Sequence, residues 1–98
     1  MIYELSFLES AWKEWNKLDN GVKEPFKKKL AERLENPRVE SAQISGMDAG
    51  YKIKLKQAGY RLIYQVIDTT VEVQVIAVGK RERNQVYKTA LKRILNLD

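Results

Sequence analysis

The amino-acid sequence predicts an α+β fold in which a mostly antiparallel four-stranded sheet carries an N-terminal helical hairpin and a C-terminal helix. Three observations predict this class: helical spacing of apolar residues before residue 36, strand-like patterns between residues 51 and 79, and a final helical stripe after residue 84. The expected order of elements is β-α-α-β-β-β-α. A chain of 98 residues can bury one core but not two, so we expect a single domain over residues 1–98.

The chain should begin with a short strand and a first helix. Residues 2–7 alternate between two sets of side chains, which is typical of a strand. Residues 6–9 have the spacing of a capping box, which opens a helix. Apolar residues then recur at steps of three and four, and this spacing favours a core position for Trp12 and Trp15 over base stacking.

A second helix is expected from residue 22 to about residue 35. Asp19-Asn20-Gly21 should end the first helix, and Asn36-Pro37 should stop the second. The two helices would pack on the sheet as an antiparallel hairpin. The basic residues of the second helix are expected on its outer side, where they offer either a solvated face or a contact to nucleic-acid backbone. These residues are Lys23, Lys27, Lys28, Lys29 and Arg33.

Residues 51–64 should form a β-hairpin whose register can be derived from the sequence. A four-residue loop at 56–59, with glycine in the left-handed position, gives one face that is apolar apart from tyrosine hydroxyls. The other face then holds Lys54 opposite Arg61, with Lys52 beside them. Like charges in facing positions cost stability, so this face is either an anion site or a solvated edge protected by lysine. The expected pairs are Leu55–Tyr60, Ile53–Leu62 and Tyr51–Tyr64.

A third strand at 71–79 should follow a two-residue turn and extend the same apolar face. This register places Arg61 opposite Val78, and the segment after the strand brings Arg81 and Arg83 to its edge. The expected pairs are Val66–Val73, Tyr64–Val75 and Leu62–Ala77.

The remaining segments are a loop and a last helix. Residues 38–50 have no firm period and should form a loop. The last helix is expected from about residue 84 to residue 96, and it could dock on the sheet where Ile63 and Ile76 interrupt the charged face. Its expected apolar side consists of Val86, Ala90, Leu91, Ile94 and Leu95.

Composition limits the chemistry and suggests a partner. The net charge is +5, and residues 51–98 carry 10 Lys and Arg against 4 Asp and Glu, which indicates a polyanionic partner. The sequence has no histidine and no cysteine, so serine–histidine triads, histidine-based ribonuclease chemistry and zinc sites are excluded, and no cofactor or metal is expected. There is no long apolar run or signal-peptide pattern, so the cytoplasm is the expected location.

The basic residues near the hairpin suggest a phosphate site. Lys52, Lys54, Arg61 and Arg81 should converge, with Tyr87 close by. Guanidinium groups match phosphate oxygens, and a lysine crowded by like charges should have a lowered pKa that suits it to act as a base. A substrate that needs neither metal nor enzymic nucleophile is RNA, whose own 2′-hydroxyl can attack the adjacent phosphate. From the residues alone, a basic binding surface without catalysis is the simpler interpretation.

The hairpin, the third strand and the segment after it also resemble a known family. Tyr51-Lys-Ile-Lys-Leu, Gly59-Tyr-Arg-Leu-Ile-Tyr-Gln-Val and Val78-Gly-Lys-Arg-Glu-Arg-Asn-Gln-Val-Tyr87 closely resemble the RelE toxins of bacterial type II toxin–antitoxin systems. Shorter matches, such as Lys13-Glu-Trp-Asn-Lys-Leu18 and Glu35-Asn-Pro-Arg38, extend the similarity over nearly the whole chain in one register.

The resemblance implies a small RelE-like microbial RNase fold and a ribosome-dependent mRNA endonuclease. Such toxins enter the A site of the 30S subunit, contact 16S rRNA and cut the codon there, leaving a 2′,3′-cyclic phosphate and a 5′-hydroxyl. The resemblance also implies a cognate RelB-like antitoxin that wraps the toxin, shifts its C-terminal helix and blocks ribosome entry. Toxin and antitoxin together bind operator DNA and repress their own operon.

The family's site residues can be placed on this sequence. Lys54 resembles the proposed general base and Lys52 assists it, while Arg61 would hold the phosphate. Arg81 would be a general acid or a further charge stabiliser; since arginine scarcely deprotonates, we favour the electrostatic role. Tyr87 falls on the stacking tyrosine. Further contacts to RNA or the ribosome are expected from Lys23, Lys27, Lys28, Lys29, Lys56, Lys80 and Arg83.

One position departs from the family pattern. Close relatives carry a basic residue before Gly46-Met47, whereas this chain has Ser45, which puts one contact to ribosomal RNA in doubt. Two other functions remain open: a toxin of the same fold directed at DNA gyrase, as in ParE relatives, and a basic RNA-binding module without catalysis. The presence of all four basic site residues together with Tyr87 argues against a toxin directed at gyrase.

Overall fold

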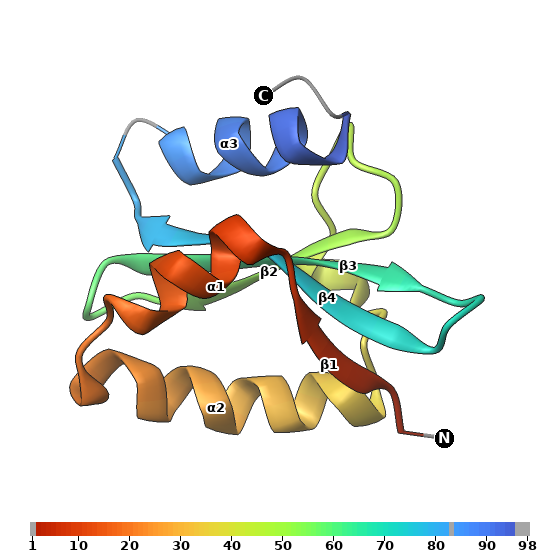
Figure 1. The fold of residues 1–98 in the computed structure, drawn as a ribbon, viewed down its shortest axis with the longest axis horizontal. Coiled ribbons are helices and arrows are strands. Elements are labelled where there is room, and N and C mark those ends of the chain that lie inside the picture. Colours follow the sequence, from red (N-terminus) through yellow and green to blue (C-terminus); the bar gives the residue numbers. More distant parts are fainter. Residues whose placement is uncertain (1, 83, 96–98) are drawn as a thin grey trace.

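The computed structural model describes residues 2–82 and 84–95, and in it one four-stranded sheet separates two helical layers (Figure 1). The sheet order is β1-β4-β3-β2; β1 runs parallel to β4, and the other neighbours are antiparallel. The predicted fold class and order of elements are confirmed. The elements are β1 (Glu4–Phe7), α1 (Glu9–Asn16), α2 (Asn20–Glu35), a 3₁₀ turn (Glu40–Ala42), β2 (Gly50–Leu55), β3 (Tyr60–Ile67), β4 (Glu72–Lys80) and α3 (Gln85–Ile94).

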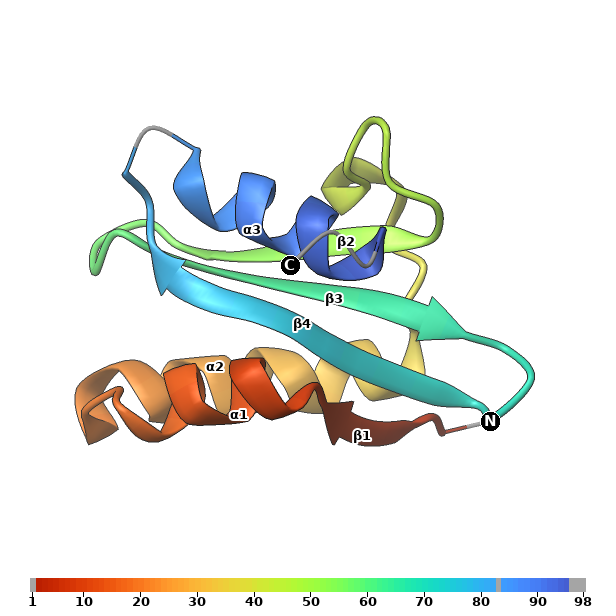
Figure 2. The same cartoon turned by 45° about the horizontal axis from the view of Figure 1, so that its top comes forward.

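Each face of the sheet has its own apolar core. Helices α1 and α2 cover one face, and α3 covers the other (Figure 2). The larger core, under α1 and α2, is built around residues such as Phe26, Ile53 and Tyr64. The smaller core, under α3, includes Ile63 and Ile76, so the predicted docking of the last helix is confirmed. The apolar residues of β3 and β4 serve both faces because the sheet is covered on both sides.

The β2–β3 hairpin has the predicted register. All three expected pairs are present, and Lys54 lies opposite Arg61. Gly59 has a φ of 70°, and its N–H donates to the carbonyl of Leu55 over 2.8 Å, which closes the four-residue loop. The rule that one face must stay apolar was therefore sufficient to fix this register.

The β3–β4 register is right at one end and wrong at the other. Val66–Val73 and Tyr64–Val75 pair as predicted. Beyond them the prediction is wrong, because a β-bulge shifts the register between Ile63 and Tyr64. The observed pairs there are Ile63–Ala77, Leu62–Val78 and Arg61–Gly79.

The bulge has a packing reason. Ile76 is the extra residue on β4, and Ile76 and Ala77 both belong to the core under α3. Val78 then returns to the core under α1 and α2. Two consecutive apolar residues can face the same side of a strand only if the alternation is interrupted there.

Some details of the helices differ from expectation. The capping box is wrong: Ser6 belongs to β1, and α1 begins after Leu8 without a side-chain cap. Trp15 is buried as predicted, but Trp12 is 49% exposed because its ring lies over the edge strand, against Phe7. Helix α2 begins after Asp19, whose side chain accepts a hydrogen bond from the N–H of Val22.

The last helix is less buried than its pattern suggested. Val86 and Ala90 are buried, but Leu91 on α3 and Leu95 directly after it are exposed. The expected end of the helix at residue 96 lies outside the described residues. The predicted loop at 38–50 contains the 3₁₀ turn, and its Met47 packs into the core under α3. No helix in the described ranges combines the length and apolar character needed to span a membrane.

Candidate active site

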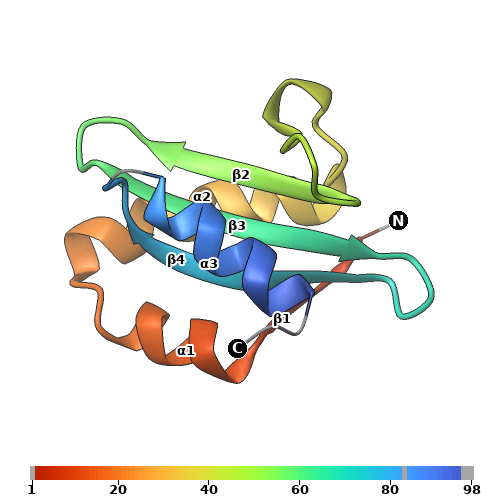
Figure 3. The same ribbon diagram turned by 90° about the horizontal axis from the view of Figure 1, so that it is seen from above.

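A cleft of about 830 Å³ opens beside α3. Helix α3 crosses β3 and β4 and does not extend over β2 (Figure 3). Residues at the N-terminal end of α3 and residues of β2 form two walls of the cleft. The cleft contains the five predicted catalytic residues and Lys56. Its lining is Gln43, Ile44, Ser45, Lys52, Lys54, Lys56, Arg61, Arg81, Asn84 and Tyr87.

Strand register brings the cations together. Lys54 pairs with Arg61, which in turn pairs with Gly79, so one row across three strands holds two cations and a residue without a side chain. Lys52 lies two residues from Lys54 on the same face. Arg81 follows β4 directly, and its N–H donates to the carbonyl of Gly59 over 2.8 Å, which ties this segment to the hairpin loop.

Arg61 is the most deeply placed cation of the cleft. The residue is 7% exposed, and its Nη1 donates to the backbone carbonyl of Tyr60 over 2.9 Å. Its Nε is buried and has no hydrogen-bond partner. A buried donor without a partner costs about 1–3 kcal/mol, so most proteins satisfy such groups. The side chain of Arg61 is thus incompletely satisfied within the protein, next to an open cleft.

The neighbouring cations of the cleft change the pKa of Lys54. The positive charge of Lys52 is the largest cause that lowers the pKa of Lys54, followed by partial loss of hydration and by the charges of Arg61, Lys56 and Arg81. The lowered pKa agrees with the direction expected from the sequence. A lysine in this environment loses its proton more readily than an isolated lysine does.

No acidic side chain neutralises the cleft in the described part of the chain. The ion pairs found there are all elsewhere: Lys13–Glu9, Lys27–Glu24, Arg38–Asp68 and Arg93–Glu14. Uncompensated positive charge in a cleft attracts anions and strengthens their binding.

Arg33 supports the cleft from behind, contrary to its predicted position on the outer side of the helix. It follows Phe26 and Leu30 on the sheet-facing side of α2. Its Nη1 donates to the carbonyl of Lys52 over 3.1 Å and to the hydroxyl of Tyr64 over 2.9 Å. The Tyr64 hydroxyl donates to the carbonyl of Pro37 over 2.6 Å, and burial raises the pKa of that hydroxyl. The network fixes β2 at the position of Lys52.

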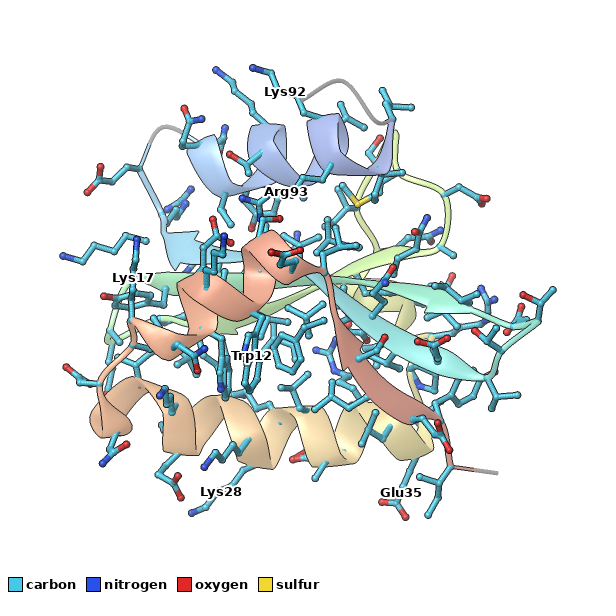
Figure 4. The ribbon with its side chains drawn as sticks, viewed as in Figure 1. Trp12, Lys17, Lys28, Glu35, Lys92 and Arg93 are labelled. Atoms are coloured by element: carbon cyan, nitrogen blue, oxygen red, sulfur yellow. The ribbon has the colours of Figure 1, made fainter. Side chains whose placement is uncertain are left out.

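The other predicted RNA-binding residues do not form one surface. Lys29 lines a groove of about 440 Å³ together with Lys54 and Lys56, so it continues the basic surface around the edge of β2. Lys28 points away from the sheet on the outer side of α2 (Figure 4). Lys27 pairs with Glu24.

Three further residues from that prediction lie apart from the cleft lining or outside the described structure. Lys23 is half-buried on α2 and does not line the cleft. Lys80 lines a small separate pocket that also contains Glu14. Arg83 lies outside the described residues.

Sequence reasoning missed several residues of the cleft. Gln43, Ile44 and Asn84 line it but carry no charge and follow no periodic pattern, so composition and spacing gave no signal. Asn84 precedes α3 with a φ of 60° in the left-handed region, which asparagine tolerates better than most residues. The motif that ends at Tyr87 did contain Asn84, and this was the only available indication.

Known proteins resemble this chain over nearly its whole length. A family model described as ParE toxin of type II toxin–antitoxin system, parDE, matches residues 5–85. The mRNA interferase toxin RelE of Escherichia coli strain K12 is 59% identical over 95 residues, covering 97% of this chain and 100% of the relative.

Solved structures give the same result. The structure of an E. coli RelE double mutant in the free state has a TM-score of 0.89 and 56% sequence identity, covering 96% of this chain and 99% of that chain. The toxin in the intact E. coli RelBE toxin–antitoxin complex has a TM-score of 0.80 and 58% identity, covering 83% of this chain and 99% of that chain. The resemblance seen in the sequence is confirmed. This chain belongs to the RelE toxins, within the ParE toxin family of type II toxin–antitoxin systems.

Proposed function

We propose that this protein is a metal-independent endoribonuclease that cuts mRNA codons in the A site of the ribosome and thereby inhibits translation. The observation that carries the proposal is the cleft, where five cations converge with no acidic partner in the described residues and a buried Arg61 keeps one donor unpaired. Such a site suits a phosphodiester. The relative from E. coli, which matches nearly the full chain, is named an mRNA interferase toxin.

The chemistry needs only groups that the cleft, the RNA and water supply. The 2′-hydroxyl of a codon nucleotide attacks its adjacent phosphate, and neutral Lys54 accepts the proton. The bond between phosphorus and the 5′-oxygen breaks, and the departing 5′-oxygen takes up a proton from water, so the products are a 2′,3′-cyclic phosphate and a 5′-hydroxyl. The lowered pKa of Lys54 increases the neutral fraction that can serve as base.

The remaining residues act on charge and position. Arg61 and Arg81 stabilise the additional negative charge that develops on the phosphate oxygens in the transition state. Lys52 contributes further positive charge to this stabilisation, and its charge also lowers the pKa of Lys54. Tyr87, at the N-terminal end of α3, stacks on a base of the codon and holds the RNA in the cleft. Lys29, Lys54 and Lys56 extend the contact to RNA around the edge of β2.

The partners follow from the same assignment. A cognate RelB-like antitoxin neutralises the toxin, as the E. coli relative forms a RelBE toxin–antitoxin complex. The complex of toxin and antitoxin binds operator DNA and represses its own operon. The site of action is the cytoplasm, where translating ribosomes are found.

The test is primer-extension mapping of an mRNA on programmed ribosomes, with and without the protein. We expect breaks that are confined to the codon in the A site and that require the ribosome. If no ribosome-dependent break appears, the proposal is wrong.

A second candidate, a gyrase poison, rests on the description of the family model as a ParE toxin. Incubation with gyrase and supercoiled plasmid tests it. Linearised plasmid in the absence of any mRNA break would replace the first proposal by the second.

A further inference from the structure

The outer edge of β4 is open over its second half. β1 pairs with Glu72–Val75 only, because the chain leaves the sheet after Phe7 and turns into α1. The bulge at Ile76 follows directly, at the point where the neighbouring strand ends. Backbone groups on the open edge need other partners, since strand edges carry unpaired donors and acceptors.

Two side chains from opposite faces of the sheet take these positions. The Oε1 of Glu14, on α1, accepts from the N–H of Val78 over 3.1 Å. The Nη1 of Arg93, on α3, donates to the carbonyl of Ile76 over 2.8 Å. Glu14 and Arg93 also bind each other through two parallel hydrogen bonds of 2.9 Å each. One network therefore joins α1, β4 and α3 around the edge of the sheet.

The Glu14–Arg93 pair is partly buried and has a defined geometry. The Arg93 side chain is 12% exposed and the Glu14 side chain 31% exposed. Two parallel bonds between a guanidinium and a carboxylate fix orientation as well as distance. Arg93 lies on the side of α3 that faces α1 and the sheet, whereas its neighbour Lys92 points away (Figure 4). Arg93 is therefore an anchor for the C-terminal half of α3.

The opposite end of α3 lines the cleft. Asn84 and Tyr87 are part of the cleft wall, and Asn84 makes no side-chain capping bond to the helix. Tyr87 precedes Arg93 by six residues, which is about 9 Å along a helix. A helix of this length moves as one body, so the place of Arg93 on β4 determines where Tyr87 lies in the cleft.

We infer that Glu14 and Arg93 are positioning residues for RNA cleavage, which they support by holding α3 so that Tyr87 faces the scissile codon. This inference rests on the proposed function and adds to it two residues that lie outside the cleft lining. Neither residue touches the RNA. Their effect reaches the reaction through the position of Tyr87.

The experiment measures single-turnover cleavage on programmed ribosomes for Arg93→Met and Glu14→Gln. We expect Arg93→Met to lower the rate by roughly 10-fold, because small misplacements of binding groups are costly. Glu14→Gln should lower the rate less, since glutamine still accepts from Val78. The matched control is Arg38→Met, which breaks the exposed Arg38–Asp68 pair and should leave the rate unchanged.

A double-mutant cycle separates positioning from general stability. In a Tyr87→Ala background, Arg93→Met should lower the rate by less than about 2-fold, because the residue through which it acts is gone. Hydrogen exchange in Arg93→Met should be accelerated by a larger factor for α3 amides than for β3 amides, because β3 amides report only the change in global stability. Rate losses that simply multiply, or exchange that is accelerated by the same factor in α3 and β3, would overturn the inference.

The wild-type protein distinguishes the two levels of the proposal. If it cuts in the A site and Arg93→Met cuts equally fast, the inference about the anchor is wrong and the proposed function stands. If the wild-type protein makes no cut, the proposed function is wrong and the inference falls with it.

Discussion

Arg61 and Arg93 are both largely buried, but the protein treats them in opposite ways. Arg93 binds a carboxylate through two hydrogen bonds and also a backbone carbonyl. Arg61 binds one backbone carbonyl, keeps its Nε unpaired and shares its cleft with other cations. Burying a charge is favourable only when partners replace the lost water. The difference teaches that the arginine at the β4 edge is satisfied by partners within the protein, whereas the cleft leaves an arginine donor and several cations without partners among the described residues, which supports the proposal that it receives an anion.

The largest expected effect lies in the cleft. Arg61→Ala and Arg81→Ala should each lower the single-turnover rate of A-site cleavage by about 100-fold or more, the scale of losing a group that stabilises transition-state charge. The rates are measured with ribosome and toxin in excess over mRNA. Unchanged rates would refute the role of either arginine and remove the basis of the contrast with Arg93.

The pH dependence of cleavage tests the state of Lys54. Only the neutral amine accepts a proton, and its fraction grows as pH rises toward the pKa, so the rate should increase about tenfold per pH unit below that value. Because neighbouring cations lower the pKa, the rise should level off at a lower pH than for an ordinary lysine. Lys54→Met should abolish the slope. A wild-type cleavage rate that does not rise with pH below the pKa of Lys54 would contradict the role of Lys54 as base.

Substitutions of Arg61 and Arg93 should rank in the opposite order for the loss of unfolding free energy and for the loss of cleavage rate. Arg93→Met leaves Glu14 and the carbonyl of Ile76 without their partner and should lower the free energy of unfolding by about 1–3 kcal/mol. Arg61→Met removes one hydrogen bond, to the Tyr60 carbonyl, but also an unpaired donor and like-charge repulsion, so its loss of unfolding free energy should be smaller than that of Arg93→Met. Urea titration of both variants measures the difference. Equal losses would show that the cleft contributes to stability as the edge does.

The smallest effect is expected at an exposed ion pair. Arg38 and Asp68 approach to 2.6 Å, but their side chains are 46% and 62% exposed. Arg38→Met should therefore change the free energy of unfolding by less than about 1 kcal/mol, because solvent screens such pairs. Urea titration of Arg38→Met and Arg93→Met measures both losses of unfolding free energy. Equal losses would show that burial does not explain the difference between the two ion pairs.

The fold was predictable wherever one face of an element had to stay apolar. This condition gave the β2–β3 register and the docking of α3 on Ile63 and Ile76. It failed at the bulge, because Ile76 and Ala77 are both apolar and their shared side depends on α3 packing above them. It also failed for Arg33, whose charge suggested solvent although Tyr64 and the carbonyl of Lys52 hold it at the sheet.

The cleft was predictable for its cations and not for its other walls. Alternation along β2 and the register with β3 are enough to place Lys52, Lys54 and Arg61 on one face from the sequence alone. Gln43 and Ile44 reach the cleft from the loop before β2, whose path depends on tertiary contacts such as the burial of Met47. The Glu14–Arg93 pair spans 79 positions in sequence and forms around a bulge, so no local pattern could reveal it.

The proposed mechanism depends on one step, in which an uncompensated basic cleft promotes attack by the RNA's own 2′-hydroxyl. The most direct test is single-turnover cleavage of an A-site mRNA that carries one 2′-deoxynucleotide at the mapped cleavage position. This substitution should abolish cleavage at that position, while the unmodified mRNA yields a 2′,3′-cyclic phosphate end. Cleavage of the deoxy-substituted mRNA at the unmodified rate would contradict the claim.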